Sequence, residues 1–329
     1  MIGLTTGDAA GIGPEIAGRL CRALLKDRAD VSVAVLADRR IMLPSLGVNI
    51  PTGTPAALEC LRDRRGIYLL DRKNLDPREA VPGTACATCG KRSVEDLLYG
   101  VELCRAGFLD GLVYGPLNKH AFQMGGYAYS GTIPLLAAYC GVSESQAGEV
   151  NVVDGVWTVR VTSHIPLGQV AQRLTAEGIE RKIRFLYRQM IQNGELQPRL
   201  AVAGLNPHNG DGGAFGREEI ELIAPAVRQA CGQGIPVSGP YAADTLFQRA
   251  FQGEFNGIVT MYHDQGQIAM KTRGFDRIIT IPGGLPILAA TPAHGTAYDI
   301  AGRGLASESA LYCAFRYVWK SACRRLAGT

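Results

Sequence analysis

The amino-acid sequence predicts an α/β protein with a largely parallel sheet, and two observations support this. Short apolar runs rich in β-branched residues, such as 31–38 and 257–263, recur along the chain and are typical of buried strands. Longer stretches in which apolar residues recur every three or four positions, such as 13–27 and 175–191, lie between them. Alternation of this kind favours parallel strands joined by helices.

The expected elements follow one another in chain order. Each strand is a short apolar run that ends near glycine or a polar residue, and each helix has an apolar face. The first helix also carries Pro14 at its start, where proline is tolerated. The expected strands are 1–6, 31–38, 66–71, 111–115, 156–163, 200–206, 257–263 and 277–283. The expected helices are 13–27, 93–108, 175–191, 217–231 and a last one from about 307 onward.

Composition excludes several classes of protein. The chain has 329 residues, enough for one large or two ordinary domains. The net charge of +4 is small and mixed along the sequence, so nucleic acid is not an expected partner. No apolar run approaches the roughly 18 residues of a membrane helix, and residues 1–8 lack the features of a signal peptide. We therefore expect a cytoplasmic protein that does not bind membranes.

The nine cysteines are scattered singly, which suits reduced thiols. Cys86 and Cys89 form one C-x-x-C pair, but a structural zinc site would need a second pair at suitable spacing. We expect these two residues to be ordinary loop thiols, with metal or redox chemistry as the less favoured alternative.

Polar residues of catalytic type follow several expected strands. Asn118 and Lys119 come after 111–115, His164 after 156–163, His208 after 200–206, and His263 ends 257–263. Ligands of open α/β sheets bind beyond the carboxyl ends of the strands. These side chains are therefore predicted to share one edge of a binding cleft.

Three of the five histidines, His164, His208 and His263, end expected strands. Imidazoles converging from separate loops would bind a divalent metal and leave positions open for substrate oxygens. The three histidines could equally be ordinary loop residues that bind no metal. Asp244 and Asp264 are candidate further ligands or bases, although an Asp before a helix such as 245–251 is often only a cap.

Three glycine-rich segments are candidate ligand loops. Residues 7–16 lack a complete G-x-G-x-x-G, so a tight strand-to-helix turn accounts for them. Residues 208–219 either let backbone amides approach a ligand or only turn the chain. Residues 292–304 are more specific, because Asp299 follows the turn at His294 and Gly295. An Asp beside adenosine can bind both ribose hydroxyls, which favours NAD over NADP.

Seven segments occur in an order that resembles the 4-hydroxythreonine-4-phosphate dehydrogenase family, the PdxA family of pyridoxine biosynthesis. The resemblance extends from about residue 3 to residue 315. The segments are GDAAGIGPEI, GPLNK, SHIPL, GLNPHNGDGGAFGREE, GPYAADTLF, MYHDQG and HGTAYDIAG. The last is also similar to the NAD-adenosine loop of isopropylmalate and isocitrate dehydrogenases.

The resemblance implies two α/β domains with a central cleft, as in isopropylmalate dehydrogenase. Residues 1–125 and 280–329 would form a discontinuous NAD-binding domain, and residues 126–279 a domain for metal, substrate and dimerisation. It also implies an obligate homodimer in which both subunits contribute metal ligands.

Roles for individual residues follow from the motif matches. His164, His208 and His263 correspond to ligands of a divalent metal, zinc first, with magnesium, manganese or cobalt as other candidates. Asp244 corresponds to an acidic residue of the site in relatives, and Lys119 and Asp264 join it as candidate catalytic residues on the grounds of their position. The implied substrate contacts are Lys271, Thr132, Ile133 and Thr280. The implied NAD contacts are Gly284, His294, Gly295, Ala297, Asp299 and Ile300.

Departures from the family pattern leave the substrate open. Phosphate-using members have a His-Thr pair where this chain has Thr132 and Ile133, and an Arg where it has Ala289. Losing a guanidinium removes a strong anion clamp. Family members that oxidise cis-dihydrodiols of aromatic carboxylates, such as terephthalate dihydrodiol, also lack the His-Thr pair. The GPLNK segment instead resembles the branch that uses sugar-acid phosphates.

The expected reaction is oxidation of a secondary alcohol in a small anionic substrate by NAD, with the proton taken by Asp244 or a desolvated Lys119. The metal would also support decarboxylation of a β-keto acid product. Two other classes remain open. A metal-dependent hydrolase would use the three histidines but not the 292–304 loop. A non-catalytic paralogue would bind a small ligand, but it would be expected to have lost its metal ligands.

Overall fold

The computed structural model describes residues 1–27, 30–53, 58–61 and 64–327. The chain divides into two compact units, each of which is considered by itself. Unit 1 comprises Met1–Gly148 and Ile279–Thr329, and unit 2 comprises Glu149–Ile278. Residues 126–148, assigned from sequence to the metal and dimerisation domain, lie in unit 1. Among the described residues, no helix combines the length and apolar character needed to cross a membrane.

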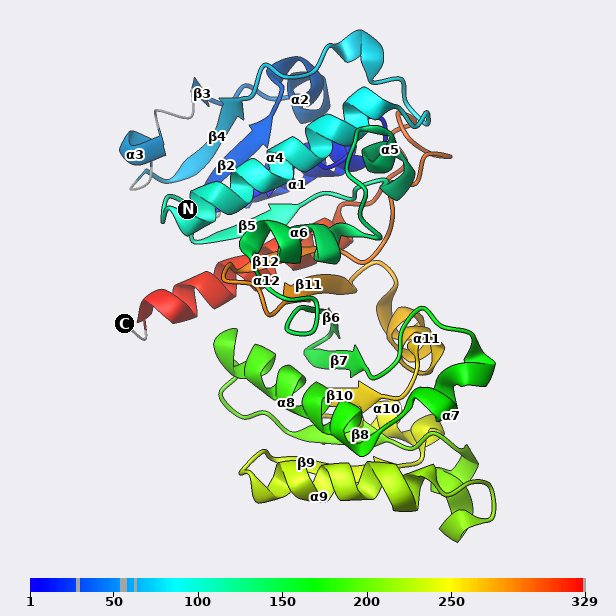
Figure 1. The fold of residues 1–329 in the computed structure, drawn as a ribbon. Coiled ribbons are helices and arrows are strands. Elements are labelled where there is room, and N and C mark those ends of the chain that lie inside the picture. The colour runs from blue at the N-terminus through cyan, green and yellow to red at the C-terminus, as the bar shows by residue number, and fades with distance from the viewer. Residues whose placement is uncertain (28–29, 54–57, 62–63, 328–329) are drawn as a thin grey trace. The chain divides into compact units, whose positions relative to one another are not determined.

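Unit 1 contains a sheet in the order β3-β4-β2-β1-β5-β12-β11 (Figure 1). Neighbouring strands β3-β4, β4-β2, β2-β1, β1-β5 and β5-β12 are parallel, and β11 is antiparallel to β12. Buried aliphatic residues fill its central strands, as expected for strands covered on both faces. The strands are β1 (Ile2–Thr5), β2 (Ser32–Ala37), β3 (Thr52–Gly53), β4 (Gly66–Asp71), β5 (Gly111–Tyr114), β11 (Ile279–Gly283) and β12 (Ala289–Pro292).

Helices cover both faces of the unit 1 sheet. A Cβ on Gly100 of α4 would touch Leu112, whereas a Cβ on Gly111 would touch Val318 of α12. Because neighbouring strand residues point to opposite faces, α4 and α12 lie on opposite sides. The helical segments are α1 (Gly13–Lys26), α2 (Arg39–Leu46), α3 (Leu58–Leu61), η2 (Pro77–Glu79), α4 (Ala87–Arg105), α5 (Lys119–Met124), α6 (Thr132–Cys140) and α12 (Ser309–Ala327).

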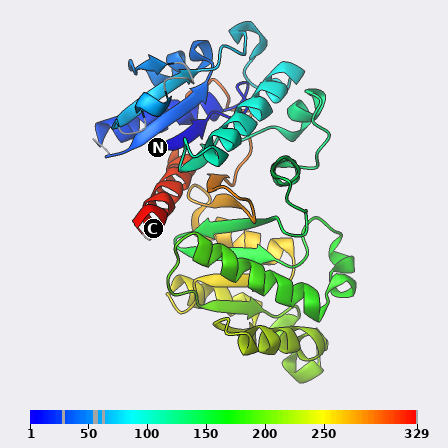
Figure 2. The same cartoon turned by 60° about the vertical axis from the view of Figure 1, so that its left-hand side comes forward.

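Unit 2 contains the strand order β6-β7-β10-β8-β9, with β6 antiparallel to β7 and the others parallel. The strands are β6 (Gly148–Val153), β7 (Val156–Arg160), β8 (Leu200–Ala203), β9 (Val237–Tyr241) and β10 (Gly257–Thr260). In Figure 2, α8 crosses the near face of this sheet. The helical segments are η3 (Leu167–Gln169), α7 (Val170–Arg173), α8 (Ala176–Gln192), η4 (Pro207–Gly213), η5 (Glu219–Ile223), α9 (Ala224–Gly232), α10 (Ala243–Phe251) and α11 (His263–Gly274).

The α/β class predicted from sequence is confirmed, and a strand occupies part of each expected strand segment. The stretch after β10 differs from the expectation, because it turns at once into α11, which begins at His263. Its glycines and polar residues give α11 little amphipathic pattern, so it was not among the expected helices. Helix α4 begins at Ala87 rather than near Ser93. Cys86 therefore caps this helix and Cys89 lies in its first turn, so the expectation of loop thiols was wrong for Cys89.

Candidate functional site

Three loops of unit 1 meet beyond the carboxyl ends of β1, β5 and β12. The Asp8 backbone N–H donates to the Pro116 carbonyl at 3.0 Å, and the Ile12 N–H donates to the Thr296 carbonyl at 3.0 Å. The Asn118 amide reaches Thr296 Oγ1 at 3.4 Å. The residues 7–16, 116–119 and 294–302 therefore form one structure, which we call the unit 1 edge.

Glycine permits the close approaches within the unit 1 edge. Gly7 has a φ of +71°, and a Cβ there would overlap the Pro116 carbonyl. A Cβ on Gly11 would lie 2.8 Å from Thr296 Cβ. Residues 7–16, which lack a complete dinucleotide fingerprint, thus form a tight strand-to-helix turn. Their glycines allow residues 294–302 to pack closely against this turn.

The segment 294–302, which we call the cofactor loop, contains most of the predicted NAD contacts. Ala297 has a φ of +43°, a conformation that side chains rarely adopt and that often occurs at functional sites. His294 Nδ1 lies 3.0 Å from the Gly295 carbonyl. Asp299 and Gly295 are exposed, so Asp299 is accessible to a ligand, as the prediction of a ribose contact requires.

Gly284, the other predicted NAD contact, lies at the end of β11 with a φ of +82°. A Cβ on Gly284 would overlap the Gln146 carbonyl, so the close backbone packing there requires glycine. Ile300 lies in the cofactor loop and is partly exposed.

A buried carboxyl group that the sequence did not single out lies beneath the cofactor loop. Asp8 is fully buried, and it accepts hydrogen bonds from Tyr298 Oη at 2.7 Å and from the Ala10 N–H at 2.9 Å. Burial raises the pKa of Asp8 despite these two donors. Burial and the neighbouring Asp8 also raise the pKa of Tyr298. The position of an Asp directly after the first strand was the signal available in the sequence.

The predicted substrate residues of unit 1 lie at helix starts and in the sheet. Lys119 is exposed and begins α5, behind the Asn118 cap. Thr132 and Ile133 begin α6, and both are partly exposed. Thr280 lies in β11, paired with Thr291.

Position 289, where the resemblance implied an Arg in phosphate-using members, is apolar here. Ala289 is buried in β12 in a cluster with Leu97, Leu112, Leu136 and Ile287. Position 289 therefore provides no positively charged side chain for an anionic substrate.

The three predicted metal ligands follow strands β7, β8 and β10 of unit 2. The His164 and His263 rings lie together, with centroids 5.6 Å apart. The ring of His208 lies against Phe215, with centroids 6.4 Å apart. Within the described part of one chain, no group of three His, Cys, Asp or Glu side chains is arranged to hold a metal ion. The structure thus brings two of the predicted ligands together and leaves His208 separate from them.

The side chains that follow His263 have distinct roles. Asp264 Oδ1 lies 2.6 Å from His263 Nδ1, a contact that leaves Nε2 available to a ligand. The Gln265 amide donates to the Gly204 carbonyl at 2.7 Å and accepts from the Met261 N–H at 2.7 Å. Gln265 therefore ties the end of β8 to the end of β10. We call the loops that follow β7, β8 and β10 the unit 2 edge.

His208 lies on a left-handed turn. The residues 208–212 all have positive φ, including the non-glycine residues His208 (51°), Asn209 (58°) and Asp211 (44°). Consecutive side chains in this conformation are costly and need support from their surroundings. Asn209 Oδ1 is buried and has no hydrogen-bond donor among the described residues.

Glu219 supplies that support. It is buried, and its Oε1 accepts the backbone N–H groups of Leu205 and Asn206, each at 2.7 Å. Its Oε2 accepts from the Asn206 amide at 2.9 Å. Burial alone would raise the pKa of Glu219, but the donors of Asn206 and Leu205 outweigh it and hold this pKa below its ordinary value. Glu219 was missed from sequence, where it resembled a surface helix residue.

The remaining predicted site residues of unit 2 are exposed. Asp244 lies in the first turn of α10, a helix that packs against η4, which carries His208. Lys271 lies two turns along α11 from His263.

A buried ionic network fixes the residue before His164. Arg160 donates to Ser163 Oγ at 2.9 Å, to Asn151 Oδ1 at 3.1 Å and to Glu149 Oε2 at 2.5 Å. Gln267 of α11 shares the Asn151 oxygen at 2.5 Å. The loop that carries His164 is thus tied to the helix that His263 begins.

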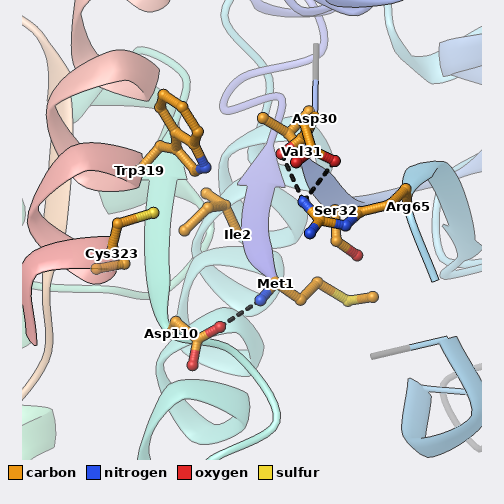
Figure 3. Close-up of a pocket in the computed structure, with 10 residues that line it drawn as sticks. Met1, Ile2, Asp30, Val31, Ser32, Arg65, Asp110, Trp319 and Cys323 are labelled. Carbon is orange, nitrogen blue, oxygen red and sulfur yellow. Dashed lines mark hydrogen bonds and ion pairs between the residues drawn. The ribbon is translucent and has the colours of Figure 1, made fainter. Parts of the chain in front are cut away.

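A separate cavity of about 290 Å³ opens at the other end of the unit 1 strands. Figure 3 shows the Met1 amine paired with Asp110 there, with Trp319 and Cys323 of α12 on one side. The cavity borders the amino ends of β1 and β2. It therefore lies at the edge opposite to the one where ligands of α/β sheets bind.

Comparison with known proteins agrees with the motifs. The family model described as "Pyridoxal phosphate biosynthetic protein PdxA" matches residues 30–318. A Pseudomonas aeruginosa relative is 42% identical over 98% of this chain and 96% of its own. A Beijerinckia indica protein named 4-hydroxythreonine-4-phosphate dehydrogenase is 36% identical over 96% of this chain and 93% of its own.

Solved structures extend the likeness to the fold. The 4-hydroxythreonine-4-phosphate dehydrogenase of Klebsiella pneumoniae has a TM-score of 0.83 at 31% identity, covering 98% of this chain and 99% of its own. A terephthalate 1,2-cis-dihydrodiol dehydrogenase of Burkholderia xenovorans has a TM-score of 0.67 at 26% identity, covering 97% of both. The motifs, the fold and these full-length matches agree: the chain belongs to the PdxA family.

Proposed function

We propose that this protein is an NAD-dependent and divalent-metal-dependent dehydrogenase that oxidises a secondary alcohol in a small anionic substrate. The pairing of His164 with His263 supports it most directly, because an imidazole from the loop after β7 and one from the start of α11 lie side by side where substrates of α/β proteins bind. The names of the relatives agree with this reaction class. The cofactor loop, with exposed Asp299 and the strained Ala297, supports NAD as the oxidant.

The donor chemistry fits a metal of the zinc type. His263 donates from Nδ1 to Asp264, the arrangement that orients ligating histidines in metal sites. A divalent cation supplies Lewis-acid polarisation of a substrate oxygen, and NAD supplies the hydride acceptor. The chain's own residues would hold and orient these groups, with Asp244 or Lys119 as the proton acceptor and Lys271 as a cation for the substrate anion.

We further propose that the metal site is shared between two copies of the chain, with His208 and His263 contributed by different subunits. The separation of His208 from the other pair within one chain supports this arrangement. A homodimer with a shared active site follows from it.

Metal retention tests the ligand set. Replacement His208→Ala should lower the metal content of the purified protein and reduce turnover by at least about 100-fold, since removing even indirect support of a ligand costs 10- to 100-fold. The exposed His120 in α5 offers a matched control, and His120→Ala should change neither quantity. Unchanged metal content and turnover in His208→Ala would exclude this site.

Subunit mixing tests whether the site is shared. The variants His208→Ala and His263→Ala should each be inactive alone. If the two ligands come from different chains, a mixed dimer of the variants has one intact set, and activity returns after unfolding and refolding together. If both ligands come from the same chain, no mixed dimer has an intact set, and activity stays absent.

The substrate has two candidates. 4-Hydroxythreonine 4-phosphate or a related phosphorylated hydroxy acid is favoured by the names of the relatives. A cis-dihydrodiol of an aromatic carboxylate is favoured by the buried apolar setting of Ala289 and by the likeness to the terephthalate dihydrodiol enzyme. NADH formation with each compound separates them, and release of carbon dioxide shows whether decarboxylation follows.

NAD binding distinguishes the proposal from a metal-dependent hydrolase. A ligand that binds only the folded state raises the melting temperature. We expect NAD to do so, and we expect Asp299→Ala to remove most of the shift. The absence of any shift with the native protein would favour the hydrolase, which has no use for the cofactor loop.

A further inference from the structure

The two cysteines of the C-x-x-C pair occupy the first turn of α4. Cys86 is the residue that caps this helix, and its Sγ accepts the Cys89 backbone N–H at 3.2 Å. Both thiols reach the same acceptor, the Glu79 carbonyl, at 3.5 Å for Cys86 and 3.7 Å for Cys89. The shared acceptor and the contact of the Cys89 N–H with the Cys86 sulfur place the two thiols close together at the start of the helix.

The pair has the asymmetry of a dithiol redox centre. Cys89 is 1% exposed, whereas Cys86 is partly exposed. Burial, together with the nearby Cys86 and Asp8, raises the pKa of the Cys89 thiol well above its ordinary value. In C-x-x-C pairs at helix starts, the accessible sulfur reacts first and the other completes the disulfide. Cys86 is suited to the first role and Cys89 to the second.

The dithiol lies directly against the cofactor loop. Cys86, Cys89 and Tyr298 belong to one apolar cluster with Ala10. The turn that precedes Cys86 is held against the same cluster, because the Gly83 backbone N–H donates to the Ala10 carbonyl at 2.8 Å. A Cβ on Gly83 would lie 2.8 Å from the Tyr298 carbonyl. Because these side chains are closely packed, a shift of either sulfur would also displace Tyr298, whose hydroxyl donates to Asp8.

We propose that Cys86 and Cys89 form a reversible disulfide and that its closure weakens binding at the cofactor loop. The second half of this proposal rests on the proposed binding of NAD. In a reducing compartment such a disulfide is transient and senses the redox state.

Closure balances with a small disulfide as the oxidant. The Cys86 thiolate attacks one sulfur of the oxidant, RSSR, and one RS⁻ leaves and takes up a proton. The Cys89 sulfur then loses its proton and attacks Cys86 Sγ, and the second RS⁻ leaves and is protonated. In sum, two protein thiols and RSSR give one protein disulfide and two RSH. The two protein sulfurs lose two electrons, and RSSR gains them.

Closure also changes the geometry around the pair. The sulfur atoms must approach to about 2.05 Å, which draws Cys89 Sγ toward the helix start. Both thiols lose the hydrogens with which they contact the Glu79 carbonyl. Because the cluster around Tyr298 is closely packed, it must rearrange.

Peptide mass spectrometry tests the disulfide without any reference to NAD. Tryptic cleavage after Arg78 and Lys91 releases the segment 79–91, in which Cys86 and Cys89 are the only cysteines. After treatment with oxidised glutathione, we expect this peptide to lose two hydrogen atoms, and dithiothreitol should restore them. The exposed Cys231 should instead accumulate a glutathione adduct.

Calorimetric titration with NAD tests the coupling. We expect the oxidised protein to bind NAD at least about fivefold more weakly than the reduced protein. Cys86→Ser should bind equally before and after treatment, and Cys231→Ser should behave like the native protein. Cys86→Ser retains a helix cap, because serine is a preferred residue at that position, so folding is preserved.

Each outcome decides one point. Stable glutathione adducts on Cys86 without an internal disulfide would overturn the proposal. A disulfide that leaves NAD affinity unchanged would overturn the coupling to the cofactor loop. If the reduced protein does not bind NAD at all, the proposed function fails, while the mass measurement still decides whether the dithiol closes.

Discussion

Asp8 at the unit 1 edge and Glu219 at the unit 2 edge are both buried carboxyl groups near strand ends, yet their pKa values shift in opposite directions. Asp8 accepts one backbone N–H and one tyrosine hydroxyl. Glu219 accepts two backbone N–H groups and a side-chain amide. For Asp8 burial outweighs the two donors and raises the pKa, whereas for Glu219 the donors outweigh burial and lower the pKa.

The two edges also differ in construction. The unit 1 edge is held by backbone-to-backbone contacts that only glycine permits, as at Gly7 and Gly11. The unit 2 edge is held by side chains, namely Glu219, Gln265 and Arg160. Substitutions should therefore damage the first edge by steric overlap and the second by loss of hydrogen bonds.

The largest effect is expected from Gly7→Ala. The new Cβ would overlap the Pro116 carbonyl at a positive φ, so we expect a loss of about 3 kcal/mol in the free energy of unfolding, from backbone strain plus overpacking. Urea denaturation measures it. Gly107→Ala is the matched control, because Gly107 has a φ of +76° with no atom near the added Cβ. It should cost only about 1 kcal/mol, and equal losses would show that crowding at Gly7 is unimportant.

Glu219→Gln should cost about 2 kcal/mol, because an amide loses the charge-assisted acceptance of the Leu205 and Asn206 N–H groups. The same urea measurement applies. The control is Glu221→Gln, whose exposed carboxylate pairs with Arg217 and should contribute less than about 1 kcal/mol. A loss for Glu219→Gln no greater than for its control would refute the support assigned to Glu219.

Asp264→Asn should weaken metal binding by about tenfold, the lower range for removal of a group that orients a ligating histidine. Asn can still contact His263 Nδ1 but no longer offers a carboxylate. Competition with a zinc-binding dye measures the affinity. Asp276→Asn, at an exposed position beyond α11, is the control and should retain native affinity.

The smallest effect at neutral pH is expected from Asp8→Asn, within about 1 kcal/mol, since removing an ionisable group from a buried site offsets the weaker acceptor. The substitution should instead change how the free energy of unfolding depends on pH. Because the folded pKa of Asp8 is raised, its contribution is most favourable below the unfolded pKa and is lost as pH rises through the folded value.

Glu219 has the opposite sign. Its lowered folded pKa gives stability that is present above the unfolded pKa and is lost as pH falls through the folded value. Difference curves of unfolding free energy against pH, native minus Asp8→Asn and native minus Glu219→Gln, should therefore slope in opposite directions in the acid range. Parallel slopes would contradict the comparison between the two carboxyl groups.

Strands β3, β6, β9 and β12 were missed. The other strands and most of the longer helices could be predicted from periodicity, since alternation and amphipathic spacing act over short distances along the chain. Helix α11 could not, because packing rather than an apolar stripe stabilises it. The metal, substrate and NAD roles of the predicted residues remain predictions. Glu219 and Gln265 escaped notice because their partners, such as Leu205 and Gly204, lie far away in sequence.

The sequence by itself determined the α/β class, the family and the strand ends at which His164, His208 and His263 occur, because these depend on local pattern and on ordered motifs. Only the tertiary structure decided that His164 lies beside His263, that Asp8 is buried beneath Tyr298, and that the Cys86 and Cys89 thiols share the Glu79 carbonyl at a helix start. Such proximity and burial arise when distant segments pack together, and residue types along a chain do not specify them.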